Sequence, residues 1–200
     1  MSHTRPPLAQ RPEGAAGRVF GLLMEAINAP AYRFAFDLLD LKPAHDVLEI
    51  GFGTGRMIEL MLARTHGRVA GVDPTPTMVA WTRSRAAVKR EADRVWLSLG
   101  GDGELDEPPA SFDRIVALHS FQFWADPAAS VRRMRALLRP GGRLVLILRD
   151  HSRGGADRLP NPLSRRPDEA EATRRLLAQN GFETRLARCG RRVGVVGEVR

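Results

Sequence analysis

The chain has 200 residues, of which 43% are hydrophobic, and its formal net charge is +8. This is enough apolar material for one compact domain, and it excludes general disorder. No apolar run is long enough to cross a bilayer, and Cys189 is the only cysteine, so the sequence excludes an internal disulfide framework and a cysteine-based metal cluster. We therefore expect a cytoplasmic protein without a membrane span or a metal site.

The positive charge comes almost entirely from arginine, because Lys42 and Lys89 are the only lysines. Clustered basic residues are typical of proteins that bind nucleic acid, since they neutralise its phosphates. Here the arginines are spread over nearly every predicted helix and loop instead of being gathered on one face. This distribution argues against nucleic acid as the partner.

The first residues, 1–14, combine three prolines and two arginines with few large apolar groups, which predicts a flexible tail. No apolar segment typical of a secretory signal follows them. Residues 15–200 are expected to form a single domain.

Two apolar stripes at helical spacing open this domain, over residues 19–27 and 31–39. They predict two lid helices within residues 15–41. A break at residues 28–30 is expected to separate them, because proline inside a helix removes a hydrogen bond.

Short apolar strands alternate with helices in the next part of the chain, an order typical of a parallel sheet covered on both faces. The predicted strands cover residues 46–50, 69–72, 95–99, 113–118 and 143–148, and the predicted helices cover 56–66, 77–91 and 126–138.

The C-terminal part differs from this alternation. A helix predicted over residues 168–180 precedes two strands, 182–189 and 193–199, whose link is so short that they can only form an antiparallel hairpin. The sequence therefore predicts an α/β fold: a Rossmann-like, doubly wound sheet of seven mostly parallel strands with a C-terminal antiparallel hairpin.

Three glycines at alternate positions follow the first predicted strand: Gly51, Gly53 and Gly55. Glycine permits a tight turn and lets a ligand lie against the backbone. The G-x-G-x-x-G spacing of dinucleotide-binding proteins is not met, because Arg56 stands where the last glycine belongs. Glu49 precedes the turn, where a carboxylate can meet an ammonium group. The pattern indicates a cofactor that carries an amino acid, although a tight helix–strand junction and a strand-end charge are the simpler interpretations.

Acidic residues also follow the second and third predicted strands. Asp73 lies 22 residues beyond Gly51, where a carboxylate can accept both hydroxyls of a ribose. Asp102 and Gly103 follow the third strand, within reach of an adenine edge. Each aspartate also has a structural interpretation, Asp73 as a helix cap and Asp102 as part of an ordinary Asp-Gly turn.

In this order, these features resemble the class I S-adenosylmethionine-dependent methyltransferases, in particular the small-molecule, type 11 group that includes ubiquinone- and menaquinone-biosynthesis enzymes. The resemblance covers about residues 18–199. It rests on residues 47–55, on Asp73, on residues 101–102, and on the strand 112–116 with the later run 138–144. It implies S-adenosyl-L-methionine as the cofactor and S-adenosyl-L-homocysteine as the product.

Carried over to this sequence, the resemblance assigns the methionine part of the cofactor to Glu49 and the three glycines, the ribose to Asp73, and the adenine to Asp102 and Gly103. The cofactor-binding residues that it implies are Glu49, Gly51, Phe52, Gly53, Gly55, Asp73, Pro74, Thr75, Asp102, Gly103 and Leu118.

A catalytic base is optional in this chemistry, because methyl transfer from a sulfonium is an in-line displacement that needs mainly alignment. For a hydroxyl acceptor, the candidates are His119 after the fourth strand and His151 after the fifth. A histidine at a strand end is also often a hydrogen-bonded structural group. The aromatic residues at 121, 123 and 124 are either the wall of an apolar acceptor pocket or part of the core.

The acceptor is expected to be a small molecule. The Asp/Asn-Pro-Pro-aromatic run of amino-group methylases is replaced at residues 118–121, which argues against amide or adenine methylation. The short loop 149–167 near the acceptor site carries arginines that either close over an anionic acceptor or are solvated. Tyr32 and Arg33, or the second subunit of a homodimer, are expected to complete the pocket.

Methyl transfer from S-adenosylmethionine to a small molecule is thus the function that the sequence predicts. Two alternatives stay open: a module that binds S-adenosylmethionine without turnover, and an RNA methyltransferase, which the net charge suggests.

Overall fold

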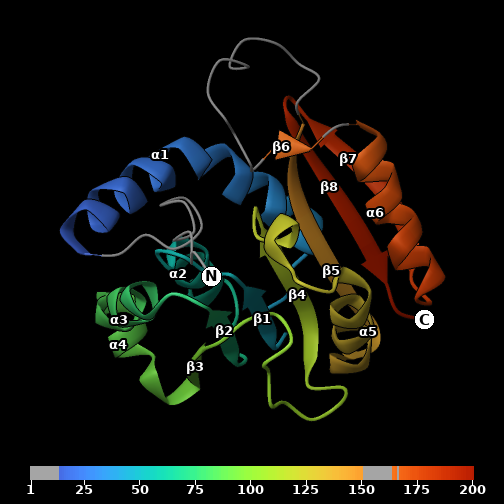
Figure 1. Cartoon of the computed structure of the whole chain (residues 1–200). Helices are drawn as coiled ribbons and strands as arrows, with labels where there is room; N and C mark the ends of the chain where they lie inside the picture. Colours follow the sequence, from blue (N-terminus) through green and yellow to red (C-terminus); the bar gives the residue numbers. More distant parts are fainter. Residues whose placement is uncertain (1–13, 151–163, 166) are drawn as a thin grey trace, which may run out of the picture.

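The computed structural model describes residues 14–150, 164–165 and 167–200 (Figure 1). The predicted tail up to residue 13, His151 and most of the loop 149–167 lie outside the described residues. None of the described helices is both long and apolar enough to span a membrane.

One mixed β-sheet forms the centre of the molecule, and seven of its strands run in the order β3-β2-β1-β4-β5-β8-β7. The strands β1 to β5 are parallel to one another, while β8 pairs antiparallel with both β5 and β7. The two-residue β6 pairs with β5 outside this path. The strands are β1 Val47–Ile50, β2 Val69–Asp73, β3 Val95–Leu99, β4 Phe112–Leu118, β5 Leu138–Asp150, β6 Ser164–Arg165, β7 Glu183–Cys189 and β8 Arg192–Glu198. The predicted Rossmann-like sheet with its C-terminal hairpin is confirmed.

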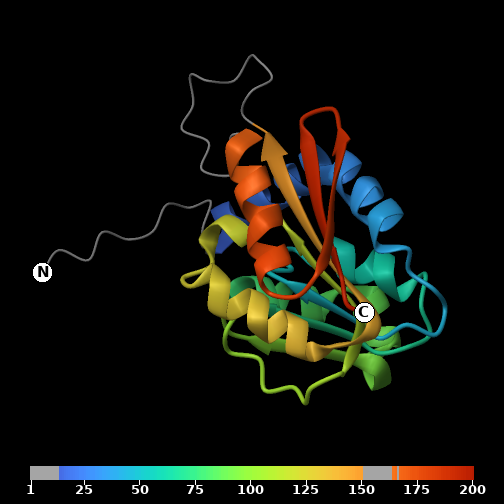
Figure 2. The same cartoon turned by 90° about the vertical axis from the view of Figure 1, so that its right-hand side faces the viewer.

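Helices cover both faces of this sheet, as parallel strands require. Alternate strand residues pack on one side against α5 and α6, which lie in front of the sheet in Figure 2. The other strand residues pack against α1, α2, α3 and α4. The helices are α1 Gly14–Leu39, α2 Arg56–Leu62, α3 Pro76–Ser84, α4 Ala86–Arg90, α5 Pro127–Leu137 and α6 Pro167–Gln179, with short 3₁₀ turns at Ala92–Arg94 and Phe121–Phe123.

The prediction of two separate N-terminal helices was wrong. A single helix, α1, runs from Gly14 to Leu39 and includes Pro30. Proline inside a helix costs about 3 kcal/mol. The second half of α1 buries Phe34, Leu38 and Leu39 against the sheet, and each such side chain contributes about 1.5 to 3 kcal/mol. Burial therefore outweighs the lost hydrogen bond.

The prediction of one helix over residues 77–91 was also wrong, because Arg85 interrupts it. Arg85 has an extended backbone (φ −63°, ψ 138°), so α3 ends before it and α4 begins after it. The cause is tertiary, because the Arg85 side chain forms ion pairs with Glu25 in α1 and Glu59 in α2. The predicted helix 56–66 is likewise shorter, since α2 ends at Leu62 and the hydroxyl of Thr65 donates to backbone carbonyls of Pro43 and His45.

Candidate functional site

A cavity of about 1480 Å³ lies at the carboxyl ends of β1, β2, β3 and β4, and it is lined by the residues that follow these strands. Ligands of open α/β sheets bind at this edge. Pockets for a single small molecule have volumes of about 300 to 1000 Å³. The cavity is therefore large enough for a cofactor with a second molecule beside it.

The three glycines after β1 all have left-handed backbones, with φ of 75° at Gly51, 52° at Gly53 and 78° at Gly55. A Cβ on Gly51 would lie 2.6 Å from the Cβ of Ser120, whereas one on Gly53 would meet no atom within 4 Å. Gly51 and Gly53 line the cavity. Gly55 does not: it precedes α2, where a Cβ would lie 2.3 Å from Cγ2 of Thr82. Close packing of α3 therefore explains this glycine.

Asp73 connects the turns after β1 and β2. Its Oδ2 accepts a hydrogen bond from the backbone N–H of Gly53 (2.8 Å), and its Oδ1 accepts one from the backbone N–H of Thr75 (2.9 Å). The side chain lines the cavity and is only 5% exposed, and this burial raises its pKa. A carboxylate oxygen has a second lone pair, so both oxygens can still accept from a ligand. Asp73 is not the cap of α3, because Thr75 occupies that position.

Glu49 presents a buried carboxylate to the same cavity. It is 2% exposed, and its Oε2 has no hydrogen-bond partner among the described residues. Burial, and then repulsion by Asp73, raise the pKa of Glu49 well above its usual value. The hydroxyl of Tyr32 has its pKa raised by burial and then by Glu49 and Glu25. A buried acceptor without a donor is costly, so this acidic wall indicates a cationic ligand.

The adenine side of the predicted site also lies on the cavity wall. Asp102 and Gly103 follow β3, and the hydroxyl of Ser130 in α5 donates to Oδ2 of Asp102. A Cβ on Gly103 would meet no atom within 4 Å. The structure thus brings all the predicted cofactor-binding residues except Gly55 to one cavity, including Phe52, Pro74, Thr75 and Leu118.

Residues 48–146 match the family model described as "Methyltransferase domain". The match contains the glycine turn, Glu49, Asp73 and Asp102. Residues 48–146 thus form a methyltransferase domain, and the chain is similar to the class I S-adenosylmethionine-dependent methyltransferases. The resemblance seen in the sequence is confirmed.

The sequence of this chain matches parts of several named methyltransferases. Nocamycin O-methyltransferase of Saccharothrix syringae is 34% identical over 119 residues, 58% of this chain and 42% of the relative. Demethylmenaquinone methyltransferase of Tropheryma whipplei is 32% identical over 121 residues, 60% of this chain and 48% of the relative. The matched region thus spans less than half of the length of these two relatives.

A likeness to solved structures extends over most of the chain. A structure described as a SAM-dependent methyltransferase from Aquifex aeolicus superimposes with a TM-score of 0.73 at 17% identity, covering 90% of this chain and 98% of that one. The two proteins therefore have the same fold over most of this chain, including segments outside residues 48–146.

His119 lines the cavity after β4, with an unusual left-handed backbone (φ 55°). Its Nδ1 is buried and has no hydrogen-bond partner among the described residues. Burial, and then the charges of Arg149 and Arg192, lower its pKa to about 4. His119 is therefore neutral at pH 7 and is a weak proton acceptor, because a catalytic base works best with a pKa near the working pH. The other candidate, His151, lies outside the described residues.

The aromatic residues after β4 divide between core and cavity. Phe121 is buried in the core and meets Trp124 edge to face, with 5.0 Å between ring centroids. Phe123 and Trp124 line the cavity, and so does Gln122, which the sequence analysis missed. Oε1 of Gln122 and Nε1 of Trp124 are buried without a partner among the described residues. The position of Gln122, three residues after His119 and close to the end of β4, is the signal that would have identified it.

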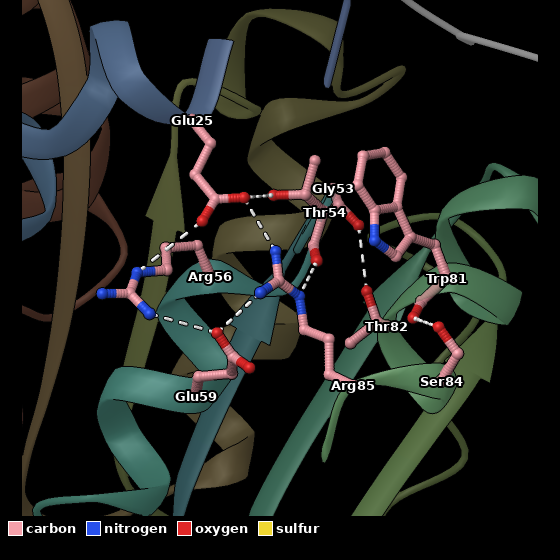
Figure 3. Close-up of polar contacts among 9 residues, drawn as sticks. All are labelled: Glu25, Gly53, Thr54, Arg56, Glu59, Trp81, Thr82, Ser84 and Arg85. Atoms are coloured by element: carbon pink, nitrogen blue, oxygen red, sulfur yellow. Dashed lines mark hydrogen bonds and ion pairs between the residues drawn. The ribbon is translucent and has the colours of Figure 1, made fainter. Parts of the chain in front are cut away.

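Arg85 ties the glycine turn to α1 and α2 (Figure 3). Its Nη2 bonds Oε2 of Glu25 in α1 (2.7 Å), and its Nη1 bonds Oε2 of Glu59 in α2 (2.6 Å). Its Nε donates to the backbone carbonyl of Thr54 (2.5 Å), and the hydroxyl of Thr54 donates to Glu25 (3.2 Å). Both Glu25 and Thr54 line the cavity. Arg85 therefore fixes α1 over the cofactor end of the cavity, a role that the sequence analysis missed because it depends on tertiary contacts.

Replacing Arg85 by methionine should lower the free energy of unfolding by about 2 to 4 kcal/mol, because two partly buried carboxylates lose the more buried of their two arginine partners. It should also weaken cofactor binding, since α1 and Thr54 lose their common anchor. Urea denaturation and calorimetry measure the two effects.

The matched control for Arg85 is Arg56→Met. Arg56 contacts the same two glutamates, but its side chain is 43% exposed against 14% for Arg85, so its loss should cost less than about 1 kcal/mol. Equal losses in the two variants would contradict the assigned role of Arg85.

The His119 ring should titrate near pH 4 in NMR spectra of the folded chain. Because this pKa lies below the usual value of about 6.5, the unfolded chain binds the proton first as the pH falls. His119 therefore lowers stability progressively between about pH 6.5 and 4, and the variant His119→Asn, which tolerates a left-handed backbone, should lose this acid sensitivity. A ring titration near pH 6.5 would contradict the prediction.

Proposed function

We propose that this chain transfers a methyl group from S-adenosyl-L-methionine to a small-molecule acceptor. The observation that carries the proposal is the buried, unpartnered Oε2 of Glu49 on the wall of a large cavity. The cofactor is a cation with an ammonium and a sulfonium group, and the carboxylates of Glu49, Asp73 and Glu25 supply the negative charge that such a ligand needs. The relatives, which include nocamycin O-methyltransferase and demethylmenaquinone methyltransferase, support a small molecule as the acceptor.

In this proposal each group of the site has a separate task. Glu49 accepts from the ammonium, Asp73 accepts from the ribose hydroxyls, and Asp102 and Gly103 lie along the adenine. The left-handed turn at Gly53 leaves room for the methionine part, because a Cβ there would project into open space, whereas Gly51 makes room for Ser120. S-adenosylmethionine supplies the methyl group on a sulfonium, which makes transfer to a nucleophile an in-line displacement.

Alignment and exclusion of water are then the main contributions of the protein. Phe123, Trp124 and Gln122 lie on the wall next to His119, where an acceptor would lie beside the cofactor. His119 would serve to shape this wall, because its lowered pKa makes it a weak base. Completion of the pocket by a second subunit stays a prediction.

A transfer experiment tests the proposal directly. The purified chain is incubated with methyl-labelled S-adenosylmethionine and, separately, with a small-molecule extract and with total RNA. Label in the small-molecule fraction is the expected result. Label in RNA would replace the proposal by RNA methylation, and calorimetric binding of the cofactor without transfer to either fraction would favour a binding module without turnover.

Glu49→Gln should weaken S-adenosylmethionine binding about tenfold or more, because a hydrogen bond to a charged group contributes about 1.5 to 3 kcal/mol. The sign of the pH dependence follows from the raised pKa of Glu49. A bound cation lowers that pKa, so binding releases a proton, and affinity should rise with pH until the Glu49 carboxyl of the free protein is ionised. Calorimetry in buffers of different ionisation enthalpy measures the proton.

The control for this variant is Glu91→Gln, which removes a partly exposed carboxylate that pairs with Arg94 and does not line the cavity. It should leave both the affinity and the released proton unchanged. Proton release that persists undiminished in Glu49→Gln would remove Glu49 from the cofactor site.

A further inference from the structure

A second pocket, of about 130 Å³, adjoins the cofactor cavity and carries the opposite charge. Its lining residues are Ile27, Asn28, His119, Arg149, Arg191 and Arg192. Asn28 and His119 line both spaces, so the two pockets are neighbours. We call the smaller one the arginine pocket.

The sheet itself brings these arginines together. Arg149 near the end of β5 and Arg192 at the start of β8 are directly paired in the antiparallel ladder. Arg191 lies in the turn between β7 and β8. Like charges opposite each other destabilise a pair of strands. Burial, and then the charges of Arg191 and Arg192, lower the pKa of Arg149. The fold therefore holds Arg149 and Arg192 together at a cost.

Several other arginines with partly buried side chains have carboxylate partners. Arg85 bonds Glu25 and Glu59, and Arg139 bonds Asp46 and Asp113. In the described part of the chain, no carboxylate forms an ion pair with Arg149 or Arg192. The buried Nδ1 of His119 at the boundary of the pocket also has no hydrogen-bond partner there. Local violations of this kind are expected where a protein binds a ligand.

We propose that the arginine pocket binds an anionic group of the methyl acceptor, a carboxylate or a phosphate. This inference rests on the proposed function and names the class of its substrate. Arginine suits such groups because its planar guanidinium can donate two parallel hydrogen bonds to a carboxylate or a phosphate. The two ligands are then sorted by charge: the cationic cofactor lies against Glu49 and Asp73, and the acceptor extends from the arginine pocket past His119 toward it.

Binding of two simple anions tests the proposal before the acceptor is known. The full chain is saturated with S-adenosylhomocysteine and titrated with inorganic phosphate and, in a separate arm, with succinate, at constant ionic strength, since salt screens such interactions. We expect Arg149→Gln and Arg192→Gln each to weaken anion binding about tenfold or more. The arm with the tighter binding distinguishes a phosphate from a carboxylate group.

Arg185→Gln is the matched control, because Arg185 belongs to the same hairpin but is exposed and does not line either pocket. It should leave anion binding unchanged. Equal anion affinity in the wild type and in both arginine-pocket variants, or an equal loss in all three variants, would overturn the proposal.

Two further readouts separate a local effect from a folding defect and from failure of the proposed function. The affinity for S-adenosylhomocysteine should be the same in all variants, and the midpoint of thermal unfolding without anion should not fall, because each substitution relieves repulsion. Phosphate or succinate should raise that midpoint in the wild type but not in the variant that carries both Arg149→Gln and Arg192→Gln. If the wild type binds no S-adenosylhomocysteine, the proposed function fails. If it binds S-adenosylhomocysteine but its affinity for the anions does not depend on Arg149 and Arg192, only the present inference fails.

Discussion

The hydrogen bonds that the Asp73 carboxylate accepts from Gly53 and Thr75 fix the relative positions of two turns at the carboxyl edge of the sheet. One turn follows β1 and the other follows β2, and the parallel pairing of these strands brings their ends side by side. The turn after β1 bends away through three glycines with left-handed backbones, two of which line the cavity. A carboxylate in this position orders the backbone and still has lone pairs for a ligand.

Around this edge the protein places groups that are costly when the site is free of ligand. Glu49 is buried with an unpartnered oxygen, and its charge and that of Asp73 oppose each other. On the far side of His119, Arg149 and Arg192 oppose each other across a strand pair. The two strained groups have opposite charge, which is the arrangement expected for a site that receives a cationic donor and an anionic acceptor. Bound ligands would relieve both costs.

The helix α1 connects the site to the rest of the molecule. Its second half is held by apolar burial against the sheet, and Glu25 in its first half is held by Arg85 and Thr54. The position of α1 and the shape of the cavity are thus coupled, because Glu25 and Thr54 both hold α1 in place and line the cavity. The break between α3 and α4 at Arg85 is the local cost of this anchoring.

The sequence by itself determined the alternation of strands and helices, the C-terminal hairpin, and most of the residues predicted to meet at the cavity. These features depend on short-range patterns: apolar periodicity, glycine spacing, and acidic residues at strand ends, which a parallel sheet brings to one edge. It did not determine the continuity of α1 through Pro30 or the break at Arg85, because burial and ion pairing between distant segments decide them.

Only the tertiary structure assigned Gly55 to helix packing, showed the low pKa of His119, and assembled the arginine pocket. Arg149 and Arg192 lie far apart in the chain, and each alone is indistinguishable from a solvated charge. The register of β5 with β8 brings them together, and no local sequence pattern encodes this long-range pairing.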